Sequence, residues 1–284
     1  MKLDHNLLRS VCRAALAEDT GSGDATTLAV VPEHLQIEGV IRIREQCVCA
    51  GLPLVHAVFH ELDPDAALDD EVMEGDVCEA GTVLTRVSGK ARAILTGERV
   101  ALNFLQRLCG IATVTRRYVD AIGRHHTKIL DTRKTTPGLR ALEKYAVKQG
   151  GAENHRFGLY DRVMIKDNHR LVADLEGPGG IKRAVEACRR QYPKLEIEVE
   201  ADTLEDVAEA VQADADWILL DNMDDDEMRT AVEMIEGTAL VEASGGITLD
   251  RIPAIADTGV DFISVGALTH SAPSVDIGLD LKLS

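Results

Sequence analysis

KILDTRKTTPGLRALEKYAVKQGGAENHRFGLYDRVMIKDNHR, residues 128–170, decides the fold of this chain. The stretch contains two short apolar runs, residues 128–130 and 163–165, and cations follow each of them: Arg133 and Lys134 the first, Lys166 the second. It carries ten Lys and Arg against five Asp and Glu, whereas the whole chain has 31 against 48 and a net charge of −17. Cations at the ends of buried strands predict an anion-binding site.

Three cations of this stretch have a plainer interpretation. Arg140, Lys144 and Lys148 are spaced four residues apart, so a helix would carry them on one face. We expect this face to be solvated and to take no part in the site.

The same alternation of strand and helix continues to the end of the chain. Six apolar runs predict strands, and helical patterns lie between them. The runs are 128–130, 163–165, 195–199, 217–220, 239–241 and 262–265, and the helices are 138–149, 180–191, 203–213, 224–236 and 248–258. Strands that alternate with helices form βαβ units and a parallel sheet. Only 3% of residues are aromatic, so the core must consist of Val, Ile, Leu and Ala, as is typical of such sheets.

The polar residues after each run favour a barrel over an open sheet. Asp131, Lys166, Glu200, Asp221 and Ser244 all stand at or just after the carboxyl end of a predicted strand. In a barrel these ends converge on one mouth, where active sites lie. Because six strands are predicted where the full fold has eight, we predict an α/β fold with an incomplete TIM-like barrel.

The first part of the chain has a mixed pattern. Helices are predicted at 4–19 and 51–62 and strands at 36–44 and 83–87, followed by a helical stretch at 97–125 that Gly110 is expected to break in two. We predict a smaller N-terminal α+β domain at 1–111, the barrel at 112–271, and a tail at 272–284 that packs back on the N-terminal domain.

Composition argues against several classes of protein. An acidic chain without a basic stripe is unsuited to nucleic acid, and no apolar run approaches the roughly 18 residues of a membrane helix. No signal peptide is visible, so we expect a cytoplasmic protein. Of the six cysteines only Cys47 and Cys49 are close in sequence, which favours reduced thiols over a zinc site.

Three groups of side chains are predicted at the mouth. The first is cationic and comprises Arg133, Lys134, His155, Arg156 and Lys166, a set suited to several anionic groups. The second is acidic: Glu200 and Asp221 end consecutive strands and are suited to Mg²⁺. Glu198 would face the same side of its strand as Glu200, so the pattern leaves the choice between them open.

The third group is rich in glycine and follows the last two strands. It comprises Ser244, Gly245, Gly246 and Gly266. Glycine lets backbone N–H groups approach a phosphate, and barrels often place a phosphate site at these loops. Together the three groups predict a phosphorylated ligand, a divalent metal and a multiply anionic partner.

Long motifs in the chain resemble those of the carboxylating nicotinate-nucleotide pyrophosphorylases, also called quinolinate phosphoribosyltransferases. They are EDTGSGDAT at 18–26, ERVALN at 98–103, CGIAT at 109–113, DTRKTTPG at 131–138, GG at 150–151, NHR at 154–156, IKDNH at 165–169, LDN at 220–222, EASGG at 242–246 and VGALTH at 265–270. The resemblance spans nearly the whole chain. It departs visibly at Cys109, where the family often has Ser.

The resemblance implies an activity and an assembly. Quinolinate and phosphoribosyl pyrophosphate, with Mg²⁺, would give nicotinate mononucleotide, pyrophosphate and CO₂ in de novo NAD biosynthesis. The family is dimeric, and the N-terminal domain of one subunit covers the barrel mouth of the other, so we expect a homodimer with shared active sites or a higher oligomer.

The resemblance also implies roles for individual residues. Arg133, Thr135, His155 and Arg156 would bind substrate, and Arg99 would reach quinolinate across the interface. Lys134 and Lys166 would neutralise phosphoribosyl pyrophosphate, and Ser244, Gly245, Gly246 and Gly266 would bind its 5-phosphate. The family's spacing selects Glu200, with Asp221, as the carboxylates that support Mg²⁺. Lys134, Lys166, Glu200 and Asp221 are therefore the predicted catalytic residues.

Two alternatives stay open. One is a related phosphoribosyltransferase, such as a molybdenum-locus paralogue, that acts on another small acid; the pair His155 and Arg156 favours a dicarboxylate instead. The other is a barrel that binds a phosphorylated metabolite as a sensor, for which both Glu200 and Asp221 would be unnecessary.

Overall fold

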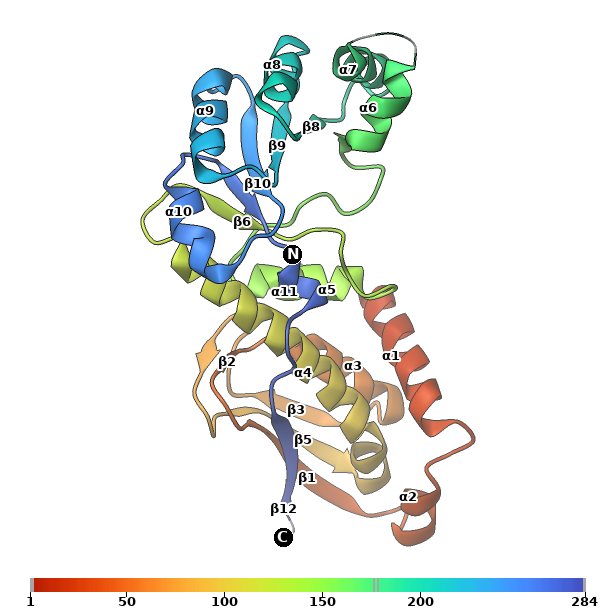
Figure 1. The fold of residues 1–284 in the computed structure, drawn as a ribbon. Helices are drawn as coiled ribbons and strands as arrows, with labels where there is room; N and C mark the ends of the chain where they lie inside the picture. The colour runs from red at the N-terminus through yellow and green to blue at the C-terminus, as the bar shows by residue number, and fades with distance from the viewer. Residues whose placement is uncertain (1–2, 176, 178, 283–284) are drawn as a thin grey trace. The chain divides into compact units, whose positions relative to one another are not determined.

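The computed structural model describes residues 3–175, 177 and 179–282, and the chain divides into two compact units (Figure 1). Unit 1 consists of Met1–Arg116, Thr136–Gly151 and Leu268–Ser284. Unit 2 consists of Arg117–Thr135 and Ala152–Ala267. Each unit therefore takes its residues from more than one segment of the sequence.

Unit 1 is an antiparallel sheet with helices. Its sheet has the order β12-β1-β5-β3, and β2 and β4 form a separate small pair. The strands are β1 (Gln36–Ile43), β2 (Cys47–Val48), β3 (Ala67–Asp70), β4 (Val77–Cys78), β5 (Val83–Lys90) and β12 (Ile277–Lys282), and the helices are α1 (His5–Thr20), α2 (Ala25–Val30), α3 (Leu52–Leu62) and α5 (Arg140–Gln149). The last strand, β12, pairs antiparallel with β1 from Ile277 opposite Ile43 to Lys282 opposite Glu38.

The predicted break at Gly110 is wrong. Helix α4 (Ala91–Ala121) runs without interruption through this position. A Cβ at Gly110 would lie 1.9 Å from the carbonyl oxygen of Pro273, so the glycine allows the chain before β12 to touch the helix. Glycine serves close backbone approach here and does not end the helix.

The expectation of a solvated face on α5 is also wrong at its centre. Lys144 is 1% exposed, whereas Arg140 and Lys148 are half-buried. Other segments of unit 1 hold this helix: Glu143 accepts a bond from Arg107 at 2.9 Å and Tyr145 donates to Glu74 at 2.7 Å. Periodicity placed the three cations on one face, but it could not tell that the face is covered.

Unit 2 is the predicted parallel sheet with helices. Six strands run in the order β6-β11-β10-β9-β8-β7. They are β6 (Lys128–Leu130), β7 (Val163–Ile165), β8 (Ile197–Ala201), β9 (Trp217–Asp221), β10 (Leu240–Ser244) and β11 (Phe262–Ser264). Among the residues that the structure describes, no ladder joins β7 to β6, and the prediction of an incomplete α/β barrel is confirmed.

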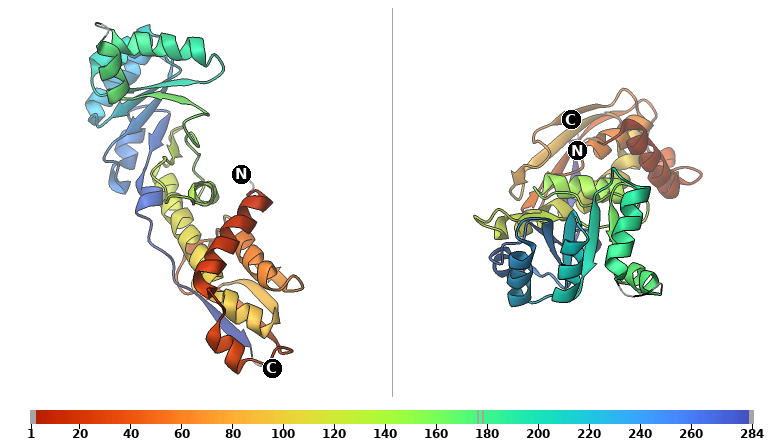
Figure 2. Two further views of the ribbon diagram at one scale, coloured as in Figure 1. Left: turned by 90° about the vertical axis from the view of Figure 1, so that its right-hand side faces the viewer. Right: turned by 90° about the horizontal axis from the view of Figure 1, so that it is seen from above.

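The four helices that were predicted after residue 151 are present, and two further helices, α6 and α11, are added. They are α6 (Asp167–Asp174), α7 (Gly180–Gln191), α8 (Leu204–Gln212), α9 (Asp225–Ile235) and α10 (Ile252–Ala256), with the 3-10 turn η1 (Leu249–Arg251) and, at the boundary with unit 1, α11 (Ala267–His270). Helix α7 packs against β7 and β8, and α8 packs against β8 (Figure 2). Helix α6, directly after β7, was not predicted. Within the described ranges, no helix combines the length and hydropathy needed to span a membrane.

Candidate active site

The carboxyl ends of the unit 2 strands surround a cavity of about 390 Å³. Eight of the residues predicted for the site line it: Arg133, Lys134, His155, Arg156, Lys166, Glu200, Asp221 and Ser244. Six of them come from the ends of β6, β7, β8, β9 and β10 or the loops that follow these strands, and His155 and Arg156 lie in the loop after α5. Parallel strands collect these ends at one edge of the sheet, and this is why residues up to 111 positions apart in the sequence meet here.

Two arginines, Arg133 and Arg156, form a cationic wall of the cavity, and the protein offers their guanidinium groups few hydrogen-bond acceptors. Arg156 is 9% exposed and donates to the carbonyl of Arg162 at 3.1 Å. The buried Nε of Arg133 has no hydrogen-bond partner among the described residues. Burial, and then the charge of Arg133, lower the pKa of Arg156, so the two guanidinium groups repel each other. An anion between them would remove the repulsion and accept the unused donor.

His155 is held from two sides. Its backbone N–H donates to Oδ1 of Asp131 at 2.8 Å. Its Nε2 lies 3.2 Å from Oε2 of Glu198 and 3.3 Å from Oε2 of Glu242. Burial alone would lower the pKa of His155, but the bonds to these two carboxylates outweigh it and raise the pKa to about 9. The ring is therefore a cation at neutral pH, buried except for the edge that lines the cavity.

Glu198 was considered only as an alternative to Glu200 at the metal site, and Glu242 was not predicted as a site residue. Both are 0% exposed, and burial followed by the charge of Glu242 raises the pKa of Glu198. Arg162 also approaches Glu198, at 3.6 Å, and Ser264 donates to Glu242. A glutamate inside an otherwise apolar strand was the available signal, because a buried carboxylate must have a charged or donating partner.

The acidic wall consists of three carboxylates. One oxygen each from Glu200, Asp202 and Asp221 lies within 4.8 Å of the other two. Burial, and then the charges of Glu200 and Asp202, raise the pKa of Asp221, while Lys166 and Lys134 act in the opposite direction. Nζ of Lys166 contacts Oε2 of Glu200.

The structure places Glu200 and Glu198 in two different groups of side chains. Glu198 pairs with His155, whereas Glu200 lies close to Asp202 and Asp221. Clustered carboxylate oxygens that repel each other fit a hard divalent cation such as Mg²⁺. Asp202 had not been predicted as part of this group.

The glycine-rich loop after β10 begins beside the acidic wall. Ser244 and Asp221 are direct register partners at the ends of β10 and β9. Gly245 and Gly246 both have left-handed φ angles, +87° and +57°, which place their backbone in a conformation that other residues rarely adopt. The loop therefore presents backbone rather than side chains, as a phosphate cradle requires.

The remaining predicted residues lie outside the lining of the cavity. Thr135 follows Arg133 and Lys134 in the loop after β6, and its N–H donates to the carbonyl of Arg133 at 2.9 Å. Gly245 and Gly246 belong to the loop just described, and Gly266 follows β11. Arg99 is exposed on α4 in unit 1.

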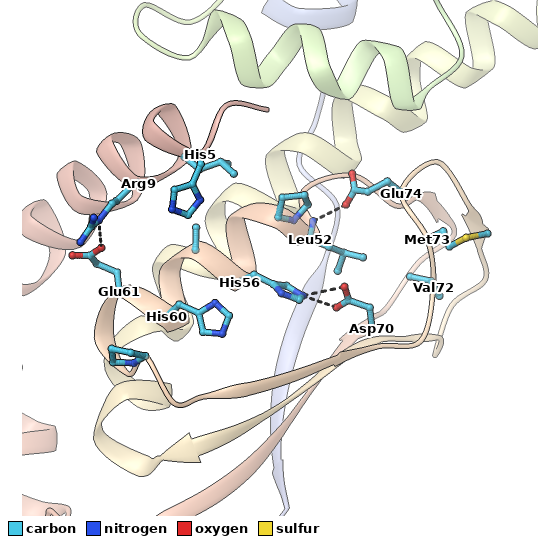
Figure 3. Close-up of a pocket in the computed structure, with 14 residues that line it drawn as sticks. His5, Arg9, Leu52, His56, His60, Glu61, Asp70, Val72, Met73 and Glu74 are labelled. Atoms are coloured by element: carbon cyan, nitrogen blue, oxygen red, sulfur yellow. Dashed lines mark hydrogen bonds and ion pairs between the residues drawn. The ribbon is translucent and has the colours of Figure 1, made fainter. Parts of the chain in front are cut away.

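A second cavity, of about 900 Å³, lies within unit 1 and contains none of the predicted residues (Figure 3). His5, His56 and His60 line it together with acidic and apolar side chains. Its polar groups are largely paired with each other: His56 Nε2 lies 3.0 Å from both oxygens of Asp70, and Arg9 donates to Glu61 at 3.3 Å. Such internal pairing leaves few groups for a ligand, unlike the cationic wall of unit 2.

An incomplete α/β barrel whose mouth combines arginines, clustered carboxylates and a glycine loop is suited to a class of enzymes that act on phosphorylated and other anionic ligands. Two family models cover almost the whole chain. They are quinolinate phosphoribosyl transferase, N-terminal domain, at residues 24–109, and the C-terminal domain of the same family at 111–280. The chain belongs to the quinolinate phosphoribosyltransferase family.

Individual proteins agree with this assignment. A Synechocystis protein named probable nicotinate-nucleotide pyrophosphorylase (carboxylating) is 46% identical, with 94% of this chain and 90% of that protein aligned. A Bacillus subtilis protein with the same name is 42% identical over 99% and 96%. The solved nicotinate-nucleotide pyrophosphorylase from Francisella tularensis superimposes with a TM-score of 0.92 and 36% identity, over 99% of this chain and 98% of that one.

Proposed function

We propose that this protein transfers the phosphoribosyl group of phosphoribosyl pyrophosphate to quinolinate and releases CO₂ and pyrophosphate, giving nicotinate mononucleotide for de novo NAD biosynthesis. The observation that carries the proposal is the cationic wall. Arg133 and Arg156 repel each other, and the buried Nε of Arg133 lacks an acceptor among the described residues. Together with the imidazolium of His155 they suit a ligand with two carboxylates on a small ring, which quinolinate is.

The opposite wall suits the second substrate. Lys134 and Lys166 stand beside the acidic group, and the loop of Gly245 and Gly246 offers backbone N–H groups for the 5-phosphate. Glu200 and Asp221, with Asp202 next to them, would hold Mg²⁺, and a bound Mg²⁺ would neutralise charge on the pyrophosphate leaving group. The role of the protein's own residues is to hold the two anionic substrates in contact.

The proposed reaction needs no general base. The pyridine nitrogen of quinolinate attacks the ribose carbon without losing a proton, because it carries none. After this step the nitrogen is cationic, and it stabilises the carbanion that forms when the neighbouring carboxylate leaves as CO₂. The carbanion then takes up a proton from water, and the new C–H bond completes nicotinate mononucleotide. Lys134, Lys166, Glu200 and Asp221 would thus act through charge and position.

We also propose a homodimer whose active sites include Arg99 of the second subunit. Exposed apolar side chains in both units support an association. In unit 2, Leu171 and Val172 on α6 are 72% and 66% exposed, and in unit 1, Leu28 and Val30 on α2 are 54% and 73% exposed. Surfaces of this kind commonly mark contacts with another chain. The six cysteines are all free thiols, which accords with the reducing cytoplasm that we propose as the protein's location.

The decisive experiment is an assay with defined substrates. The protein is incubated with quinolinate, phosphoribosyl pyrophosphate and Mg²⁺, and nicotinate mononucleotide is measured by mass. Parallel incubations replace quinolinate with nicotinate, which has one carboxylate, or omit Mg²⁺. We expect product only with quinolinate and metal. Folded protein that forms no product would refute the proposal, and binding without turnover would favour a sensor.

A further inference from the structure

Asn222 contacts both the acidic wall and the glycine loop, although it was predicted for neither. It directly follows β9 and has a left-handed φ of +59°. Its Nδ2 donates to Oδ2 of Asp221 at 2.8 Å, and its backbone N–H donates to the carbonyl of Ser244 at 3.0 Å. Because a carboxylate only accepts hydrogen bonds, the amide must turn its NH₂ group to Asp221.

The other half of the amide lies against Gly245. A Cβ on Gly245 would stand 2.2 Å from Oδ1 of Asn222 and 2.8 Å from its backbone nitrogen. Only a glycine therefore allows this contact. The left-handed backbone of Asn222 is one that asparagine tolerates better than most residues, so sequence and conformation agree at both positions.

Asp221 needs such a partner. One of its oxygens lies within 4.8 Å of an oxygen of Glu200 and of an oxygen of Asp202, and like charges at this distance repel each other. A hydrogen-bond donor to Oδ2 of Asp221 counteracts this repulsion and favours one orientation of the carboxylate. Without the donor, the carboxylate can rotate away from the group.

We propose that Asn222 is a positioning residue that couples the Asp221 carboxylate to the Ser244–Gly246 loop, so that the metal side and the phosphate side of the phosphoribosyl pyrophosphate subsite keep a fixed separation. The inference rests on the proposed function for the identity of that ligand. The contacts of Asn222 themselves do not depend on it.

Two substitutions separate the side chain from the backbone. Asn222→Gly keeps the left-handed conformation and removes the amide. Asn222→Asp keeps the shape but replaces the donor that faces Asp221 with an acceptor. We expect each to raise the KM for phosphoribosyl pyrophosphate, and the Mg²⁺ concentration for half-maximal rate, about tenfold, which corresponds to about 1.4 kcal/mol. The KM for quinolinate should stay within about twofold, because Arg133 and Arg156 are untouched.

A binding measurement provides a readout apart from turnover. Mn²⁺, a spectroscopic substitute for Mg²⁺, is titrated in the presence of pyrophosphate and followed by electron paramagnetic resonance. Both variants should bind Mn²⁺ about tenfold more weakly while keeping the thermal midpoint of the wild type. If the wild-type protein forms no nicotinate mononucleotide, the proposed function fails, whereas this titration still decides the role of Asn222.

The glycine side offers a matched pair. Gly245→Ala and Gly246→Ala both place a side chain on a left-handed residue, but only at Gly245 does the new Cβ meet Asn222; at Gly246 it meets nothing within 4 Å. We expect the Gly245 variant to weaken Mn²⁺ binding more than the Gly246 variant. Wild-type metal binding in both Asn222 variants, or an equal rise in the KM of both substrates, would overturn the inference.

Discussion

Nε2 of His155 lies 3.2 Å from Oε2 of Glu198, and both side chains are buried in unit 2. Glu242 stands at almost the same distance, 3.3 Å, on another strand. A buried imidazole between two carboxylates stays protonated at a pH where a free histidine is neutral. The cationic wall of the proposed quinolinate site therefore has a third charge that the two glutamates maintain.

This pairing predicts a pH dependence. The pKa of His155, about 9, lies above its ordinary value of about 6.5, so the stabilising charge is complete below about 6.5 and is lost as the pH rises through about 9. We expect the KM for quinolinate to be steady near neutral pH and to rise above pH 9. In Glu198→Gln, which removes one carboxylate, the rise should begin at lower pH. A pH profile of kcat/KM for quinolinate is measured for the wild type and for Glu198→Gln. Identical profiles would contradict the role of Glu198 in keeping His155 protonated.

Lys134 should be needed for turnover but not for folding. It is exposed and lines the cavity of unit 2. Lys134→Ala should lower kcat/KM by at least about a hundredfold, because it removes a positive charge that would neutralise the pyrophosphate leaving group. Circular dichroism and the thermal midpoint should match the wild type. Full activity in a verified variant would remove Lys134 from the site.

Metal binding should distinguish two glutamates of one strand. Glu200→Gln removes a carboxylate from the group with Asp202 and Asp221, whereas Glu198→Gln changes a residue that pairs with His155. We expect the first to weaken Mn²⁺ binding about tenfold or more and the second to leave it within about twofold. Calorimetric titration gives both affinities. Equal losses in the two variants would argue against the selection of Glu200.

Subunit mixing tests the proposed shared site. Arg99→Ala and Lys166→Ala should each be inactive, because each removes a cation that would bind substrate. If the active site takes Arg99 from one subunit and Lys166 from the other, mixed dimers contain one intact site and recover up to about half of the activity per dimer. Differently tagged subunits allow the mixed species to be isolated first. No recovery in that species would count against a shared site.

Gly110 should be more important for stability than its helical position suggests. In an exposed helix, alanine is favoured over glycine by about 1 kcal/mol. Here the new Cβ would lie 1.9 Å from the carbonyl oxygen of Pro273, so Gly110→Ala should destabilise the protein by about 2–4 kcal/mol in denaturant unfolding.

Gly97→Ala in the same helix is the matched control. Its Cβ would meet only side-chain atoms, the nearest being Cδ1 of Leu62 at 3.0 Å, which can move. We expect a smaller loss of stability there than at Gly110. If Gly110→Ala stabilises the protein, the close approach of the Pro273 segment is not maintained in solution.

The barrel elements were predictable because their signals are local. Short apolar runs with polar ends gave β6 and β7 at their observed bounds, and helix α7 matches its predicted range as well. The cations after β6 and β7 and the carboxylates of β8 and β9 could be assigned to one site for a similar reason. Once strands are known to be parallel, their carboxyl ends must share an edge.

Local patterns could not predict which side chains are buried or which distant residues they contact. Lys144 shares its helical spacing with two less buried cations, yet it is buried, and its neighbours Glu143 and Tyr145 bond to residues distant in sequence. From its sequence context Gly110 is predicted to break the helix, whereas the structure shows that it makes room for Pro273. In both cases the deciding contact comes from a part of the chain that no local pattern includes.

The sequence by itself determined the six strands of unit 2, most of its helices, the residue types at the strand ends and the family. Only the tertiary structure decided which side chains each carboxylate meets: Glu198 pairs with His155, Glu200 stands with Asp202 and Asp221, and Asn222 contacts both Asp221 and Gly245. The physical reason is that strand periodicity gives the side of the sheet on which a residue lies, whereas its neighbours come from other strands and depend on register and depth.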